Sequence, residues 1–145
     1  MNIEIRNTLF SITVYGFSGI ADNGEYVKTA FSLMDKMWAE VKTHRLDHKG
    51  INIWVYDENN QVFAGVELNH VPAKETQLEV KTVKLSRYGY YKHIGPYSQL
   101  KNVGKAMTDE LNGRGEKIGL PYIEIYGHWN SDETKSETEL LMNLI

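Results

Sequence analysis

The alternation of apolar and polar residues predicts a strand at the start of the chain and a helix after it. Within residues 3–16, Ile12 and Val14 alternate with polar side chains, which is the period of a β-strand. Turn residues rich in glycine and asparagine follow, and residues 25–43 then carry apolar side chains at helical spacing. This stripe, which we expect to be core, comprises Tyr26, Ala30, Leu33, Met34, Met37, Trp38 and Val41.

A β-hairpin is predicted next, with strands at residues 51–56 and 61–69 and a turn at residues 57–60. Alternation assigns to one face Ile51, Ile53, Val55, Val62, Ala64, Val66 and Leu68. The other face receives Asn52, Trp54, Tyr56, Phe63, Gly65 and Glu67. We expect the aliphatic face to pack on the helix and the aromatic and polar face to form a more open surface.

The second half of the chain repeats this order. After a connector at residues 71–76, residues 78–93 predict extended chain, and Pro96 stands where a second helix would begin. Its apolar stripe comprises Tyr97, Leu100, Val103, Gly104, Met107 and Leu111. Strands at residues 122–128 and 137–145 complete the unit.

One duplicated unit of strand, helix and two-stranded hairpin therefore occupies residues 3–69 and again residues 78–145. We expect a single domain over residues 1–145, of the α+β class, in which a β-α-β-β unit is duplicated about a pseudo-twofold axis. Two antiparallel sheets, each covered on one side by its helix, would leave a central ligand cleft between the halves.

The strand pattern at residues 120–129 places a carboxylate among aromatic side chains. Ile123 and Ile125 point to one side. The other side carries Tyr122, Glu124, Tyr126 and His128. Two interpretations stand at this point: Glu124 faces a ligand in a partly dry concavity, or it lies on the wet face of an edge strand.

The composition is that of an ordinary globular domain, with 41% hydrophobic and 24% charged residues in 145. A formal charge of −3 disfavours direct nucleic acid binding. The absence of cysteine excludes disulfides, thiolate metal ligands and cysteine nucleophiles, and it fits a cytoplasmic protein. The chain begins without a signal-peptide pattern and contains no apolar run of membrane-spanning length.

Metal and cofactor sites are not expected. His44 and His48 are four residues apart, but no third ligand follows from the spacing. No glycine-rich phosphate loop follows a strand, and Ser98 and Ser136 lack a recognisable base partner.

Three short motifs resemble the GyrI-like family, the effector-binding domain of bacterial transcription activators that also closes several MerR-type and AraC-type multidrug regulators. Residues 91–97, Tyr-Lys-His-Ile-Gly-Pro-Tyr, resemble the family's entry into its second helix. Residues 120–126 and 136–140 match downstream motifs, whereas the first half matches by layout only. The family often ends its last strand with an Ile-Pro pair, which is absent from residues 141–144.

The resemblance implies an SHS2-like duplication with a drug-sized hydrophobic cleft in which a glutamate supports the binding of lipophilic cations among aromatic rings. By motif position that glutamate is Glu124. A partly buried carboxylate and aromatic faces both favour a cationic guest. The expected ligand-binding residues are Glu124, Tyr126, Tyr122, Trp54, Tyr56, Trp129 and Glu67. For the aromatic residues ordinary packing is the alternative, Trp129 is either a lid or a surface aromatic, and Glu67 would be a second carboxylate if the halves mirror each other.

Two functional hypotheses follow. The first is a stand-alone bacterial binding protein for hydrophobic, cationic or aromatic small molecules, which sequesters a compound or regulates through a partner protein. Because the strand pattern starts at residue 3, no helix-turn-helix is expected before it. The alternative is a hydrolase of electrophilic, cyclopropane-type aromatic compounds, in which Glu124 orients or deprotonates water and Tyr126 stabilises the leaving oxygen. Both hypotheses use the same glutamate.

Overall fold

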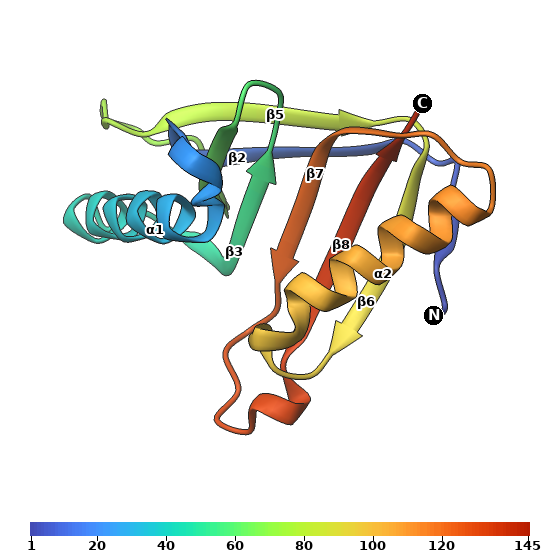
Figure 1. Ribbon diagram of the computed structural model, residues 1–145. Coiled ribbons are helices and arrows are strands. Elements are labelled where there is room, and N and C mark those ends of the chain that lie inside the picture. Colours follow the sequence, from blue (N-terminus) through green and yellow to red (C-terminus); the bar gives the residue numbers. More distant parts are fainter.

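The computed structural model describes residues 1–145 as a mixed α+β domain with one antiparallel sheet and two long helices (Figure 1). The first repeat consists of β2 (Phe10–Ile20), α1 (Tyr26–Thr43), β3 (His48–Tyr56) and β4 (Gln61–Leu68). The second consists of β6 (Tyr88–Ile94), α2 (Leu100–Gly113), β7 (Ile118–Tyr126) and β8 (Glu137–Leu144). Two further strands, β1 (Glu4–Arg6) and β5 (Glu79–Leu85), precede β2 and β6, and short 3-10 turns occupy Asp22–Gly24, Tyr97–Gln99 and Glu133–Lys135.

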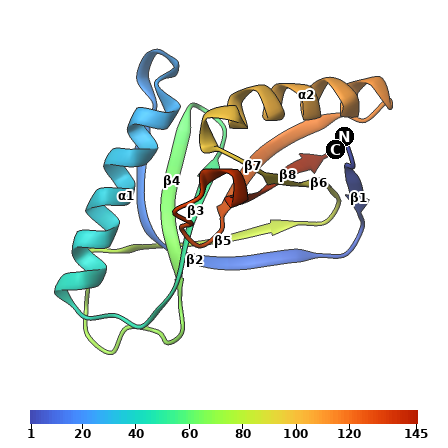
Figure 2. The ribbon, with the colours of Figure 1, turned by 90° about the horizontal axis from the view of Figure 1, so that it is seen from below.

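The strand order confirms the expected duplication. It runs β1-β6-β8-β7-β3-β4-β2-β5, and it is symmetric about the contact between β3 and β7. The strand that precedes each repeat pairs with the other repeat: β1, before β2, pairs with β6, and β5, before β6, pairs with β2. The sheets of the two halves are therefore joined edge to edge into one eight-stranded antiparallel sheet. Figure 2 shows one helix beside each half, with β3, β4 and β7 between them.

The expected division of the first hairpin into two faces is partly wrong: the aliphatic residues of β4 pack on α1 as expected, whereas Ile53 and Val55 of β3 lie on the opposite side of the sheet. In the observed register Trp54 lies opposite Ala64, so both point to the same side of the sheet. The side covered by α1 carries Trp54, Val62 and Ala64, and the opposite side carries Ile53, Val55 and Phe63. The turn sets this register by closing with a hydrogen bond from the Asp57 amide to the Gln61 carbonyl. A shift of one residue moves every side chain of a strand to the other face.

Both helices pack through equivalent positions. The buried side chains of α1 are Ala30, Met37 and Val41, and those of α2 are Leu100, Met107 and Leu111. The helices lie on the same side of the sheet, whereas the aliphatic cluster that includes Ile53, Val55 and Phe63 fills the other side. The two helices thereby leave the middle strands, β3 and β7, between them.

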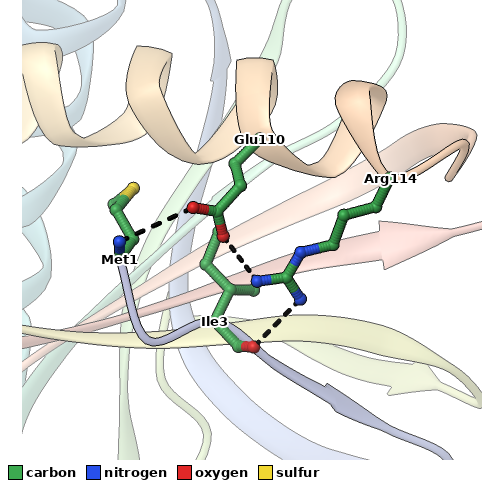
Figure 3. Close-up of polar contacts among 4 residues, drawn as sticks. All are labelled: Met1, Ile3, Glu110 and Arg114. Carbon is green, nitrogen blue, oxygen red and sulfur yellow. Dashed lines mark hydrogen bonds and ion pairs between the residues drawn. The ribbon is translucent and has the colours of Figure 1, made fainter.

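The N-terminal segment is held against the end of α2 (Figure 3). Arg114 donates to the Glu110 carboxylate at 2.6 Å and to the Ile3 carbonyl at 3.2 Å. The amino group of Met1 lies 3.5 Å from the same carboxylate. These contacts hold the segment before β1 against α2, and so support the pairing of β1 with the second repeat. No helix in the structure combines the length and apolarity that a membrane span needs.

Candidate ligand-binding cleft

A cavity of about 1000 Å³ lies between α1 and α2, above β3 and β7. Its volume is at the upper end of the range of small-molecule pockets. Six of the seven residues expected from the sequence line it: Trp54, Tyr56, Tyr122, Glu124, Tyr126 and Trp129. The structure thus brings residues from both repeats into one concave site.

The exception is Glu67, which does not line the cavity. It lies on the opposite face of the sheet, because β4 has the register described above, and it forms an ion pair with Lys49 at 3.4 Å. The expectation that Glu67 faces the cleft is therefore wrong. When the repeats are aligned from the ends of α1 and α2, the residue equivalent to Glu124 is Trp54, and the sheet places the two directly opposite each other. The pseudo-twofold axis passes between an indole and a carboxylate, so Glu124 has no acidic counterpart at the equivalent position of the first repeat.

Glu124 is 7% exposed and is held by two neighbours on its own strand. The hydroxyls of Tyr122 and Tyr126 donate to its two oxygens at 3.1 and 3.0 Å. Both tyrosines stand two residues away, on the same face of β7, which is why the alternating pattern brings them to the carboxylate. None of the ion pairs in the structure includes Glu124. The site is a buried carboxylate with hydroxyl donors and no cationic partner.

Burial raises the pKa of Glu124 above its usual value of 4.5. The hydroxyls of Tyr56, Tyr126 and Tyr122 stabilise the charged form and oppose this shift, but loss of hydration has the larger effect. Burial, followed by the charge of Glu124, also raises the pKa of all three tyrosines well above 10. The tyrosines therefore remain protonated and act as donors.

Two series of aromatic rings cross the cleft from one repeat to the other. In the first, ring centres are separated by 5.1 Å from Phe31 to Trp54, 4.8 Å from Trp54 to Tyr126 and 5.6 Å from Tyr126 to Tyr97. In the second they are separated by 6.0 Å from Tyr26 to Tyr56 and 5.6 Å from Tyr56 to Tyr122. Glu124 contacts one ring of each series through the hydroxyls of Tyr126 and Tyr122.

Several lining residues were not expected from the sequence. Tyr26, Tyr97 and Gly104 belong to the helical stripes interpreted as core, and Phe31 lies beside the α1 stripe. Their position at the margins of the stripes is the only signal that could have separated them from the core. Trp129 is 81% exposed at the rim, so it is a surface aromatic that also borders the cavity.

No protein-family model matches the chain, and no curated protein sequence matches it significantly. Solved structures do match. A bacterial transcription regulation protein from Staphylococcus aureus has a TM-score of 0.68 at 13% identity, over 99% of this chain and 98% of that one. The structure of SAV2435 bound to tetraphenylphosphonium has a TM-score of 0.65 at 14% identity, over 100% and 94%. The EcmrR C-terminal domain has a TM-score of 0.70 at 20% identity, over 100% and 99%.

A more distant match, a hydrolase from Listeria innocua, has a TM-score of 0.56 at 14% identity, over 99% of this chain and 91% of that one. At these identities the similarities establish a common fold. The GyrI-like resemblance drawn from the motifs is thereby confirmed at the level of the fold.

Proposed function

We propose that this domain binds hydrophobic organic cations in the cleft, with Glu124 as the electrostatic anchor. The observation that carries the proposal is the buried carboxylate without an ion-pair partner on the floor of an aromatic cavity. A bound cation supplies the missing opposite charge in a place where water screens it weakly. The tetraphenylphosphonium complex of a protein with the same fold supports this class of ligand.

The surrounding rings favour the same guest. Aromatic faces attract cations, and the attraction grows when the cation is removed from water. Tyr122 and Tyr126 keep their hydroxyls on Glu124 and so present their rings, rather than their polar ends, to the rest of the cavity. A cation with aromatic or aliphatic substituents would fill the space between the two ring series, whereas a small inorganic cation would leave the apolar walls unfilled.

Two ions of matched shape and opposite charge test the proposal. Tetraphenylphosphonium and tetraphenylborate differ mainly in sign, so their affinities separate the electrostatic contribution from hydrophobic burial. We expect the wild type to prefer the cation, and Glu124→Gln to bind it at least about tenfold more weakly, which corresponds to about 1.4 kcal/mol. Titration calorimetry, or fluorescence of Trp54 and Trp129, measures both affinities.

Glu67→Gln is the matched control, because it removes a carboxylate of the same type from the other face of the sheet. It should bind the cation like the wild type. Equal affinity of the wild type for the two ions, or an unchanged cation affinity in Glu124→Gln, would refute Glu124 as the anchor.

Hydrolysis is the second candidate function. The observation in its favour is the raised pKa of Glu124, which brings a carboxylate closer to the range of a general base at neutral pH. A mass-spectrometric screen of electrophilic, cyclopropane-bearing aromatic compounds tests it. Hydrolysed product should form with the wild type and not with Glu124→Gln, and equal turnover by both proteins would exclude Glu124 from the chemistry.

A further inference from the structure

The two walls of the cleft carry different chemistry although they come from equivalent helices. On the α1 side the lining residues are Tyr26, Val27, Phe31 and Met34, none of them charged. On the α2 side they are Tyr97, Ser98, Leu100, Lys101, Gly104, Lys105 and Thr108, which include two lysines. Aligned from the helix ends, Lys101 occupies the position equivalent to Phe31. The duplication thus places an uncharged wall opposite a wall that carries two lysines.

Lys101 and Lys105 are four residues apart and therefore project from the same face of α2. Both are exposed, both line the cavity, and neither belongs to any ion pair in the structure. Gly104, between them, adds no side chain to this wall, and the nearest atom to a Cβ built there is the Tyr122 hydroxyl at 4.0 Å. The same hydroxyl donates to Glu124. The two ammonium groups consequently belong to the wall that adjoins the carboxylate.

The charged residues of the lining do not all complement a ligand that carries only a positive charge. The charged lining residues are Asp57, Lys101, Lys105 and Glu124. Asp57 is paired with Lys81 at 3.6 Å, outside the set. Glu124 can neutralise one cationic group on the floor, and the two lysines at the rim remain without a counterion. A ligand that carries an anionic group a short distance from its cationic centre would complement both.

We propose that the cleft selects zwitterionic amphiphiles: an organic cation at Glu124, an apolar body along the α1 wall, and a carboxylate, sulfonate or phosphate group at Lys101 and Lys105. This inference rests on the proposed function, since it takes the position of the cationic centre from it. It adds the second polar group of the ligand and the residues that recognise it. Because the lysines are exposed, salt screens their contribution more than that of Glu124.

The experiment compares (4-carboxybutyl)triphenylphosphonium, a zwitterion at neutral pH, with its primary amide, which keeps the phosphonium but ends in a neutral group, at low ionic strength. The two compounds share the cation and the chain length and differ only in the terminal charge. We expect the wild type to bind the acid more tightly, with each lysine contributing about two- to fivefold, the range of an exposed ion pair. The preference should decrease as salt is added.

In the double variant Lys101→Gln/Lys105→Gln the ratio of the two affinities should fall to about one. The affinity for the amide should not fall, because the loss of two ammonium groups from the lining removes their repulsion of the phosphonium. Lys42→Gln, which removes a lysine on α1 outside the cavity, should keep the preference. Equal affinity of the wild type for acid and amide, or an unchanged preference in the double variant, overturns this inference and leaves cation binding standing. If neither compound binds, the proposed function itself fails, and this inference fails with it.

Discussion

Gly104 lies inside α2, where a glycine is unfavourable, and its missing side chain opens the cleft wall. A Cβ atom at this position would meet only the Tyr122 hydroxyl, at 4.0 Å, which is ordinary van der Waals contact. Alanine is favoured over glycine in a helix interior by about 0.8–1 kcal/mol. We therefore expect Gly104→Ala to raise the free energy of unfolding by roughly this amount, or the melting temperature by about 3 °C in a domain of this size.

Urea unfolding followed by far-ultraviolet circular dichroism measures this change, with an unchanged m-value as the sign that only stability has altered. Ala106→Gly is the matched control, because Ala106 is exposed on α2 outside the cavity. Ala106→Gly should lower the free energy of unfolding by a similar amount. If Gly104→Ala destabilises the protein while Ala106→Gly behaves as expected, the wall at Gly104 is tighter than the structure shows, and the reasoning is refuted.

A larger residue at the same place tests occupancy of the cleft. Leucine is a good helix former, and at Gly104 its side chain would extend into the cavity beside Tyr122. Gly104→Leu should fold as stably as the wild type and bind tetraphenylphosphonium at least about tenfold more weakly. Wild-type affinity in this variant would show that the cation does not occupy the region next to α2.

Three further outcomes are expected. The raised pKa of Glu124 means that, above about pH 4.5, the native state binds more protons than the unfolded state. The free energy of unfolding should therefore fall as pH rises through the raised pKa, relative to Glu124→Gln, and parallel pH profiles of the two proteins would contradict this. Met37→Ala and Met107→Ala, at equivalent and fully buried positions, should each lose about 2–5 kcal/mol in urea unfolding, and a loss below about 1 kcal/mol would count against the packing described. Gly16→Ala should not fold, because a Cβ there would overlap the Ala64 carbonyl, and a native-like, well-dispersed amide spectrum would contradict the close approach of β2 and β4.

The order of elements could be predicted from the sequence because each one carries its own periodicity. Both helices, the hairpin of the first repeat and the last strand occur where the patterns predict them, and the duplication follows from their order. The bounds of β7 were predicted less well from the sequence: the strand runs from Ile118 to Tyr126, whereas residues 122–128 were predicted. The exchange of β1 and β5 between the repeats could not be predicted, since pairing between distant strands leaves no mark on the spacing of residues within either strand.

The sequence likewise does not determine which side of the sheet each face of a strand occupies. Alternation along β4 correctly separates Val62 and Ala64 from Phe63, yet it does not say which set accompanies Trp54. The geometry of the turn fixes the register between β3 and β4, and this register places Glu67 on the face opposite the cleft. A residue can thus be assigned to one of two sides from the sequence, while the identity of the side depends on the register of its neighbour.

For the segment around Glu124 the sequence alone determined that a carboxylate and two tyrosines share one face of a strand, because side chains i and i+2 of a strand point the same way. It did not determine what that face borders. Only the tertiary structure decided that β7 lies beside β3 in the middle of the sheet, that the helices stand apart there, and that Trp54 takes the place of a second acid. It also decided that the α2 wall presents lysines where α1 presents an aromatic ring. These are relations between residues far apart in the chain, fixed by packing and pairing rather than by local pattern.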